Sequence, residues 1–293
     1  MSYNYDERYK NCILNGSRYL CCQPGYFADS LEYREFYVPE SHAAYDVVSM
    51  FYEATLKSSE SSILVIPDGC IDVVVSFREN QCAGISLCGT ISTSYSMDIK
   101  DSDYIFGMRF MPGKFPIALA SDNIRDFMDN QENFTMFDRE WKFIERLINA
   151  GNFYERIEAA AAYINKICDS AGYKEKVVHY AMDSICRSSG NVSIKALSNE
   201  LIYSLKYIEN IFKEYTGFTP KNMCRLARAH KAAMMLLWGR ASTKTMVSME
   251  CGYSDLSHMN RDLKNILGIN SGKINEHDFY HRDVRAAETV YTF

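Results

Sequence analysis

The chain has 293 residues, of which 47% are hydrophobic and 24% are charged. These proportions are typical of a globular protein and exclude a disordered chain, a collagen-like repeat and a membrane bundle. At roughly 150 residues per domain, the length predicts two domains. No apolar run approaches the ~20 residues of a spanning helix, and the N-terminus has neither a basic nor an apolar leader segment. We therefore expect a cytoplasmic protein without membrane association.

The formal charge of −5 is unevenly distributed along the chain. Residues 1–186 contain 17 Lys and Arg against 27 Asp and Glu, a balance of −10, whereas residues 187–293 contain 15 against 10, a balance of +5. The sign changes at the polar stretch 187–191, which we interpret as a linker. This asymmetry predicts that only the C-terminal part contacts a polyanion, and a basic domain with solvated lysines is the alternative.

Strand-like segments dominate the first part of the chain. The apolar run 62–66 and the β-branched run 70–77 flank a Pro-Asp-Gly turn, and the next strand candidates are 84–88, 94–99 and 104–110. The segment 42–56 is read as a helix or as a helix followed by a strand. Short strands separated by turn residues favour a small antiparallel β-barrel or sandwich, which we assign to residues 1–120.

Helical patterns follow in the connector, residues 121–186. The clearest helix is Phe153–Cys168, where apolar side chains recur at helical spacing: Ile157, Ala160, Ala161, Ile164, Ile167 and Cys168. Such a stripe can pair with the same helix of a second chain, which would make the protein a homodimer. The more common role of such a stripe is packing in the core of its own chain.

Two similar helical units follow in residues 187–293, so the predicted fold class is α+β with an all-α C-terminal domain. In the first unit, Ser204 caps a helix over 205–215 and Gly217 ends it. A long helix begins at Pro220. In the second unit, Ser254 or Asp255 caps a helix over 256–267, which stops at Gly268. A short helix and a tight turn precede each capped helix, which is the pattern of a double helix-turn-helix.

Residues 193–274 resemble the DNA-binding domain of AraC/XylS-type transcription regulators. One match is FKEYTGFTP at 212–220, and the second is GYSDLSHMNR at 252–261 with Lys264 and Gly268. The sequence departs from the family pattern at four positions. Asn210 replaces a frequent Arg, Met259 and Leu263 replace a Phe pair while keeping the core apolar, and Ser271 replaces a Pro. These departures leave the fold prediction intact and the DNA sequence that is read open.

The resemblance implies that both capped helices enter the major groove of double-stranded DNA, about 34 Å apart along one DNA face. Arg261 is the strongest candidate for a guanine or phosphate contact, Asn210 can read adenine, and Glu209 can accept from cytosine, while Asn260 is assigned to base readout without a particular base. The full set of DNA-binding candidates is Lys206, Glu209, Asn210, Lys213, Leu256, Ser257, Asn260, Arg261 and Lys264. A solvated helix face is the alternative for each polar residue.

The segments PDGCIDVV at 67–74 and GMRFMPG at 107–113 resemble a β-rich domain found at the N-terminus of some AraC-type regulators. The resemblance implies a sensor for a small-molecule effector or a dimerisation module. Asp68, Asp72 and Arg109 are the polar candidates for a ligand cavity. Asp68 is equally a normal turn residue, because an Asp side chain can bond to its own backbone in a turn.

An enzyme is not expected, because the phosphate-binding, dinucleotide-binding, zinc-protease and esterase motifs are all missing from the sequence. No metal or cofactor is expected either. The predicted β region has no His cluster, and His277 and His281 in the tail have no further ligand nearby. The second functional hypothesis is a protein-interaction or ligand-sequestering module whose helix-turn-helix units no longer read DNA. The sequence does not identify the effector, the operator, or activation as against repression.

Overall fold

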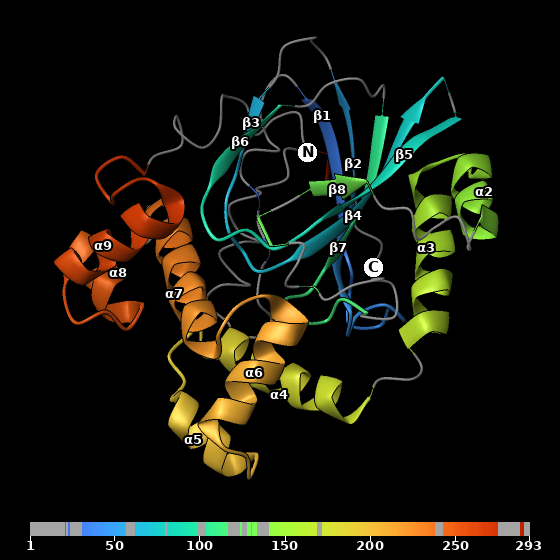
Figure 1. Cartoon of the computed structure of the whole chain (residues 1–293). Coiled ribbons are helices and arrows are strands. Elements are labelled where there is room, and N and C mark those ends of the chain that lie inside the picture. The colour runs from blue at the N-terminus through green and yellow to red at the C-terminus, as the bar shows by residue number, and fades with distance from the viewer. Residues whose placement is uncertain are drawn as a thin grey trace.

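The computed structural model describes residues 21, 23, 31–56, 62–79, 81–98, 104–116, 124, 128–129, 131–133, 141–168, 172–237, 243–274 and 288–289. Within these ranges a β region precedes a series of helices, so the predicted α+β class is confirmed (Figure 1). None of the helices in these ranges combines the length and apolar character that crossing a membrane requires.

Seven strands form one sheet in the order β8-β5-β4-β7-β2-β1-β9, and two more form a separate antiparallel ribbon, β3-β6. All neighbouring pairs in the large sheet are antiparallel except β1 and β9. The strands are β1 (Leu31–Tyr37), β2 (Val48–Leu56), β3 (Ser62–Val65), β4 (Ile71–Arg78), β5 (Gln81–Cys88), β6 (Tyr95–Asp98), β7 (Tyr104–Phe110), β8 (Gln131–Asn133) and β9 (Glu288–Thr289). The helix expected within 42–56 is not formed, because residues 40–47 form turns, whereas the strand expected after it is present as β2.

Eight helices follow β8 in the described ranges. Two of them, α2 (Trp141–Asn149) and α3 (Phe153–Cys168), cover the sheet, and α4 (Tyr173–Arg187) leads into the C-terminal units. The helices of those units are α5 (Ile194–Glu200), α6 (Leu205–Thr216), α7 (Pro220–Leu237), α8 (Lys244–Glu250) and α9 (Leu256–Leu267).

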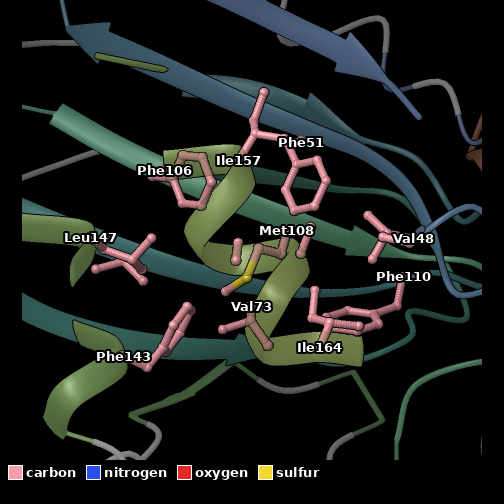
Figure 2. Packing of buried hydrophobic residues seen from close by; sticks show 14 of the residues in the cluster. Val48, Phe51, Val73, Phe106, Met108, Phe110, Phe143, Leu147, Ile157 and Ile164 are labelled. Carbon is pink, nitrogen blue, oxygen red and sulfur yellow. The ribbon is translucent and has the colours of Figure 1, made fainter. Parts of the chain in front are cut away.

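Helices α2 and α3 pack against one face of the sheet (Figure 2). Phe51 of β2 and Phe106 of β7 stack on this face with ring centroids 6.1 Å apart, and Ile157 and Ile164 of α3 lie in the same cluster. The apolar stripe of α3 is therefore buried in the core of its own chain. This is the second of the two roles considered for the stripe, and a homodimer through another surface stays a prediction.

The opposite face of the sheet packs against the C-terminal helices. Tyr52 of β2 and Ile105 of β7 belong to a cluster with Ala229 and Ala233 of α7 and Met259 of α9. Strand β7 is buried on both faces as a result, and Ile105–Phe110 are all buried. A strand covered on both sides reads as a continuous apolar run, which explains the sequence of β7.

A third cluster joins α4, α6 and α7 to the start of β4. Cys70 contacts this cluster together with Val178 of α4, Phe212 of α6 and Met223 of α7. The glycine before it, Gly69, has a φ of 77° and leaves no space for a Cβ, which would lie 2.7 Å from the methyl carbon of Met223. The sheet therefore packs closely against both helical units.

Candidate nucleic-acid interface

The first helix-turn-helix unit consists of α5, a tight turn and α6. Ser204 caps α6 by accepting a hydrogen bond from the Tyr207 amide at 3.2 Å. Gly217 ends α6 with a φ of 77°, the left-handed conformation that glycine adopts without cost. In the turn, Ile202 has a φ of 60° and is 89% exposed, an unusual conformation and position for a β-branched apolar residue.

The second unit, α8 and α9, has the same construction. Asp255, rather than Ser254, caps α9, because its Oδ1 accepts a hydrogen bond from the His258 amide at 2.7 Å. This bond and the Ser254 hydroxyl lower the pKa of Asp255, which keeps the capping carboxylate charged. Gly268 ends α9 with a φ of 73°.

Helices α6 and α9 present matching exposed stripes. The second, sixth and ninth residues of α6 are Lys206, Asn210 and Lys213, and all three are exposed. The same positions of α9 carry Ser257, Arg261 and Lys264, which are also exposed. Residues at this spacing lie on one face of a helix. We call these six residues the paired stripes.

Three other DNA-binding candidates lie differently. Leu256 is half-buried and packs against the cluster between α7 and the sheet, and Glu209 is half-buried. Asn260 is also half-buried, and its Oδ1 accepts a hydrogen bond from the Ser271 amide at 2.9 Å. An adenine contact through both polar atoms of Asn260 would require this bond to break, so the geometry favours a structural role for Asn260.

Helix α7 connects the two units through partly buried polar contacts. Arg225 donates to Oδ1 of Asp262 in α9 from Nη2 at 2.7 Å and from Nε at 3.1 Å, and Asp262 is only 2% exposed. Arg228 donates to the Gly190 carbonyl at 2.8 Å and lies over the ring of Tyr253. The linker, α7 and the second turn therefore form one connected assembly.

The connection between β5 and β6 contacts the C-terminal ends of α6 and α9. The Thr90 hydroxyl donates to the Thr216 carbonyl at the end of α6, at 3.2 Å. The Ser94 amide donates to the Ile266 carbonyl at the end of α9, at 3.1 Å. We call residues 90–94 the bridging loop. Nothing in its sequence predicts this position, because the contacts link residues more than a hundred positions apart.

Asp129 holds the bridging loop in shape. It accepts hydrogen bonds from the Ser92 amide and hydroxyl at 2.6 and 2.9 Å, and its own amide donates to the Thr90 carbonyl at 2.9 Å.

The proposed ligand residues Asp68, Asp72 and Arg109 lie together and are buried. Arg109 Nη1 donates to Asp68 at 3.0 Å, and Nη2 and Nε donate to Asp72 at 2.7 and 2.9 Å. Tyr52 donates to Asp72, and Gln23 donates to Asp68, each at 2.9 Å. Oδ1 of Asp68 also accepts from the Cys70 amide, as expected of a turn residue. The three candidates satisfy one another, so their arrangement is that of a structural network.

Burial and charge act in opposite directions in this network. Burial would lower the pKa of Arg109, but the Asp72 and Asp68 carboxylates hold it well above its ordinary value. Burial raises the pKa of Asp72, and Arg109 opposes that increase. The Arg109 guanidinium is therefore the group that limits the rise in the pKa of Asp72.

No group of three or more metal-ligating side chains occurs among the described residues. His277 and His281 of the tail lie outside the described ranges.

Two family models match the chain. Residues 197–276 match one described as a helix-turn-helix domain, and residues 38–132 match one described as a domain of unknown function (DUF6597). No curated protein matches the sequence.

Solved structures resemble the chain only distantly. The C-terminal domain of AraT, a response regulator from Geobacillus stearothermophilus, is 16% identical, covering 39% of this chain and 93% of that one with a TM-score of 0.33. ToxT from Vibrio cholerae is 10% identical, covering 82% of this chain and 95% of that one with a TM-score of 0.36. A ToxT structure with a bound unsaturated fatty acid is 11% identical, covering 82% and 92% with a TM-score of 0.34. At TM-scores this low, the likeness carries no conclusion about this chain.

Proposed function

We propose that the protein is a sequence-specific transcription regulator of AraC type, because residues 197–276 match a helix-turn-helix family model. In this proposal α6 and α9 read two successive segments of the major groove. The observation that carries it is the pair of matching exposed stripes on capped helices of equal length. No enzymatic reaction is assigned to the chain, and the proposed location is the cytoplasm, where bacterial-type regulators meet DNA.

The paired stripes divide into two kinds of contact. Arg261 and Asn210 occupy equivalent central positions and are proposed to contact base edges, Arg261 at a guanine and Asn210 at an adenine. Lys213 and Lys264, near the helix ends, are proposed to contact phosphates, which position the protein without reading sequence. Lys206 lies in the first turn of α6 and is proposed to reach a guanine or a phosphate.

Control by a small-molecule effector at the N-terminal part, and a homodimer as the active form, complete the proposal. The extensive packing between the sheet and helices α7 and α9 supports effector control, because a change in the sheet would reach both reading units. A homodimer would double the number of base pairs read.

The proposal is tested by sequencing genomic fragments that the purified full-length protein retains at about 0.15 M salt, where nonspecific phosphate binding is weakened. A shared motif with two elements about one helical turn apart is expected. Arg261→Ala should weaken binding by about 1–3 kcal/mol and relax the preference at one base pair. Arg146→Ala is the matched control, since Arg146 is an equally exposed arginine on α2, away from the stripes. If the two variants behave alike, the role assigned to Arg261 is wrong.

Salt dependence separates phosphate contacts from base contacts. Lys213→Ala and Lys264→Ala should each reduce the slope of log affinity against log salt by about 1, with the recovered motif unchanged. Retention of no common motif at any salt concentration would favour the alternative function, a protein-interaction or ligand-sequestering module. The half-buried Glu209 and the neutral Asn210 on α6 are the observations that keep this alternative open.

A further inference from the structure

A cavity of about 630 Å³ lies between the sheet and the start of α3, on the side away from the helix-turn-helix units. Strands β1, β2, β4 and β7 supply one wall through Arg34, Glu53, Phe77 and Tyr104, and α2 and α3 supply the other. The volume is within the range of small-molecule sites, which is roughly 300–1,000 Å³. The proposed DNA contacts do not involve this cavity.

One of the two arginines that line the cavity is fully engaged. Arg34 pairs with Glu53 at 3.3 Å, directly across β1 and β2, and its guanidinium lies over the Phe153 ring. The Tyr104 hydroxyl also donates to Glu53. Burial and this hydrogen bond to a carboxylate both raise the pKa of Tyr104, so the phenol stays neutral. The Glu53 carboxylate therefore already interacts with Arg34 and Tyr104, and it does not neutralise a second cation.

The other arginine, Arg156 in the first turn of α3, has no such partner. Its side chain makes no hydrogen bond or ion pair with any residue that the structure describes, and its Nε is buried without an acceptor. Its guanidinium instead rests on two aromatic faces, 5.0 Å from the Tyr104 centroid and 5.5 Å from the Phe77 centroid. Buried donors without acceptors are rare in proteins and call for an explanation.

The acidic side chains that line the cavity do not provide an acceptor for Arg156. Glu53 is engaged as described, and Glu79 is exposed at the end of β4, where water screens its charge. Phe77, Phe153 and Ile148 supply the apolar part of a lining that also contains polar side chains such as Asn152. A bound group that satisfies this environment carries a negative charge at one end and an apolar body.

We propose that this cavity binds a small carboxylate with an apolar body, whose carboxylate accepts a bidentate pair of hydrogen bonds from Arg156. A carboxylate matches a single guanidinium in charge and geometry. The role of this cavity as the effector site of the regulator rests on the function proposed above. Binding of a carboxylate in the cavity does not depend on that function and can be measured without DNA.

Helix α3 connects the cavity, through α4, to the helix-turn-helix units. Its first turn holds Arg156, and α4, which follows α3 in the chain, packs against α6 and α7. A ligand that draws Arg156 towards itself would act on the position of α3 against the sheet.

The test is isothermal titration calorimetry on the full-length protein, without DNA. The probes are sodium hexanoate, benzoate and 4-phenylbutyrate, each compared with its uncharged amide. At least one carboxylate should bind, and its amide should bind at least about tenfold more weakly, because the amide forfeits a charge-assisted bidentate pair. This comparison uses the wild-type chain alone, so it does not depend on a variant that folds.

Two variants locate the site. Arg156→Gln should reduce the affinity for the same carboxylate at least about tenfold, and Arg146→Gln on α2 should leave it unchanged. Circular dichroism checks that both variants fold, and Arg156→Lys, which keeps the charge but loses the fork, should bind with intermediate affinity. The proposal is overturned if no carboxylate binds at millimolar concentration, if acid and amide bind equally, or if Arg156→Gln binds as the wild type does. The calorimetry does not change the outcome expected of the DNA-binding experiment. One proposal can therefore be wrong while the other holds.

Discussion

Replacing Arg109 with Met would remove the one cation of the buried network while keeping a side chain of similar length. Asp72 would lose three of its hydrogen bonds, from Nε and Nη2 of Arg109, and would keep only the Tyr52 hydroxyl. Asp72 is 5% exposed, so water cannot replace the missing donors. The folded variant therefore holds Asp72 in its protonated form near neutral pH.

The cost follows from the proton balance. A carboxyl with an ordinary pKa of about 3.9 requires about 4 kcal/mol to be protonated at pH 7, at about 1.4 kcal/mol per pH unit. This agrees with the roughly 3–5 kcal/mol lost when a buried ion pair is broken from one side. Because the unfolded state binds fewer protons than the folded variant, the stability of Arg109→Met falls as pH rises. The loss should shrink to about 1–2 kcal/mol near pH 5.

The assay is urea unfolding of both proteins between pH 5 and pH 8, followed by far-UV circular dichroism. The matched control is the double variant Arg109→Met/Asp72→Asn, in which residue 72 has no charge and the part of the added pH dependence that comes from Asp72 should disappear. A destabilisation of Arg109→Met that is the same at every pH would refute the reasoning, since it would assign the loss to packing alone.

Three further outcomes test the packing around the sheet and helices. A Cβ at Gly107 would lie 2.0 Å from Cζ of the buried Tyr52, so Gly107→Ala should destabilise the protein by about 2–3 kcal/mol in urea unfolding, whereas Gly84→Ala, with no atom within 4 Å, should not cause such a loss. Burial lowers the pKa of His179 to about 4, so stability is lost as pH falls from about 6.5 to 4, when only the unfolded state takes up the proton. His179→Gln should remove that loss from the pH profile of unfolding. Thr90→Val deletes the hydroxyl that donates to the end of α6 and should cost about 1 kcal/mol, while Thr90→Ser should retain most of the stability; equal losses would contradict the assigned bond.

The local features of the C-terminal half were predictable from the sequence. Caps and stops act within one turn of a helix, so Ser204, Gly217, Pro220 and Gly268 identify the ends of α6, α7 and α9 without tertiary information. The choice of Asp255 over Ser254 as a cap depends on side-chain geometry and required the structure.

Features that depend on distant contacts were not predictable. The sequence identified Asp68, Asp72 and Arg109 as a polar set but could not show that they neutralise one another, because their pairing depends on the register of β4 and β7. Asn260 lies on the predicted recognition helix, yet its side chain is used by the Ser271 amide after the helix ends. The cavity at Arg156 was not predicted from the sequence, since four strands and two helices contribute residues to its lining.

The bridging loop has a consequence for the DNA that the protein would recognise. Its hydrogen bonds reach the carbonyl ends of α6 and α9 from a single connection of the sheet, so a part of the chain outside the proposed DNA contacts helps to hold these two helices at their separation. If these helices read DNA as proposed, a single base pair inserted between the two elements of the operator, which shifts them by about 3.4 Å, cannot be absorbed by a flexible linker. Sequence changes between β5 and β6 would then alter the spacing of the preferred operator while leaving the preferred bases the same.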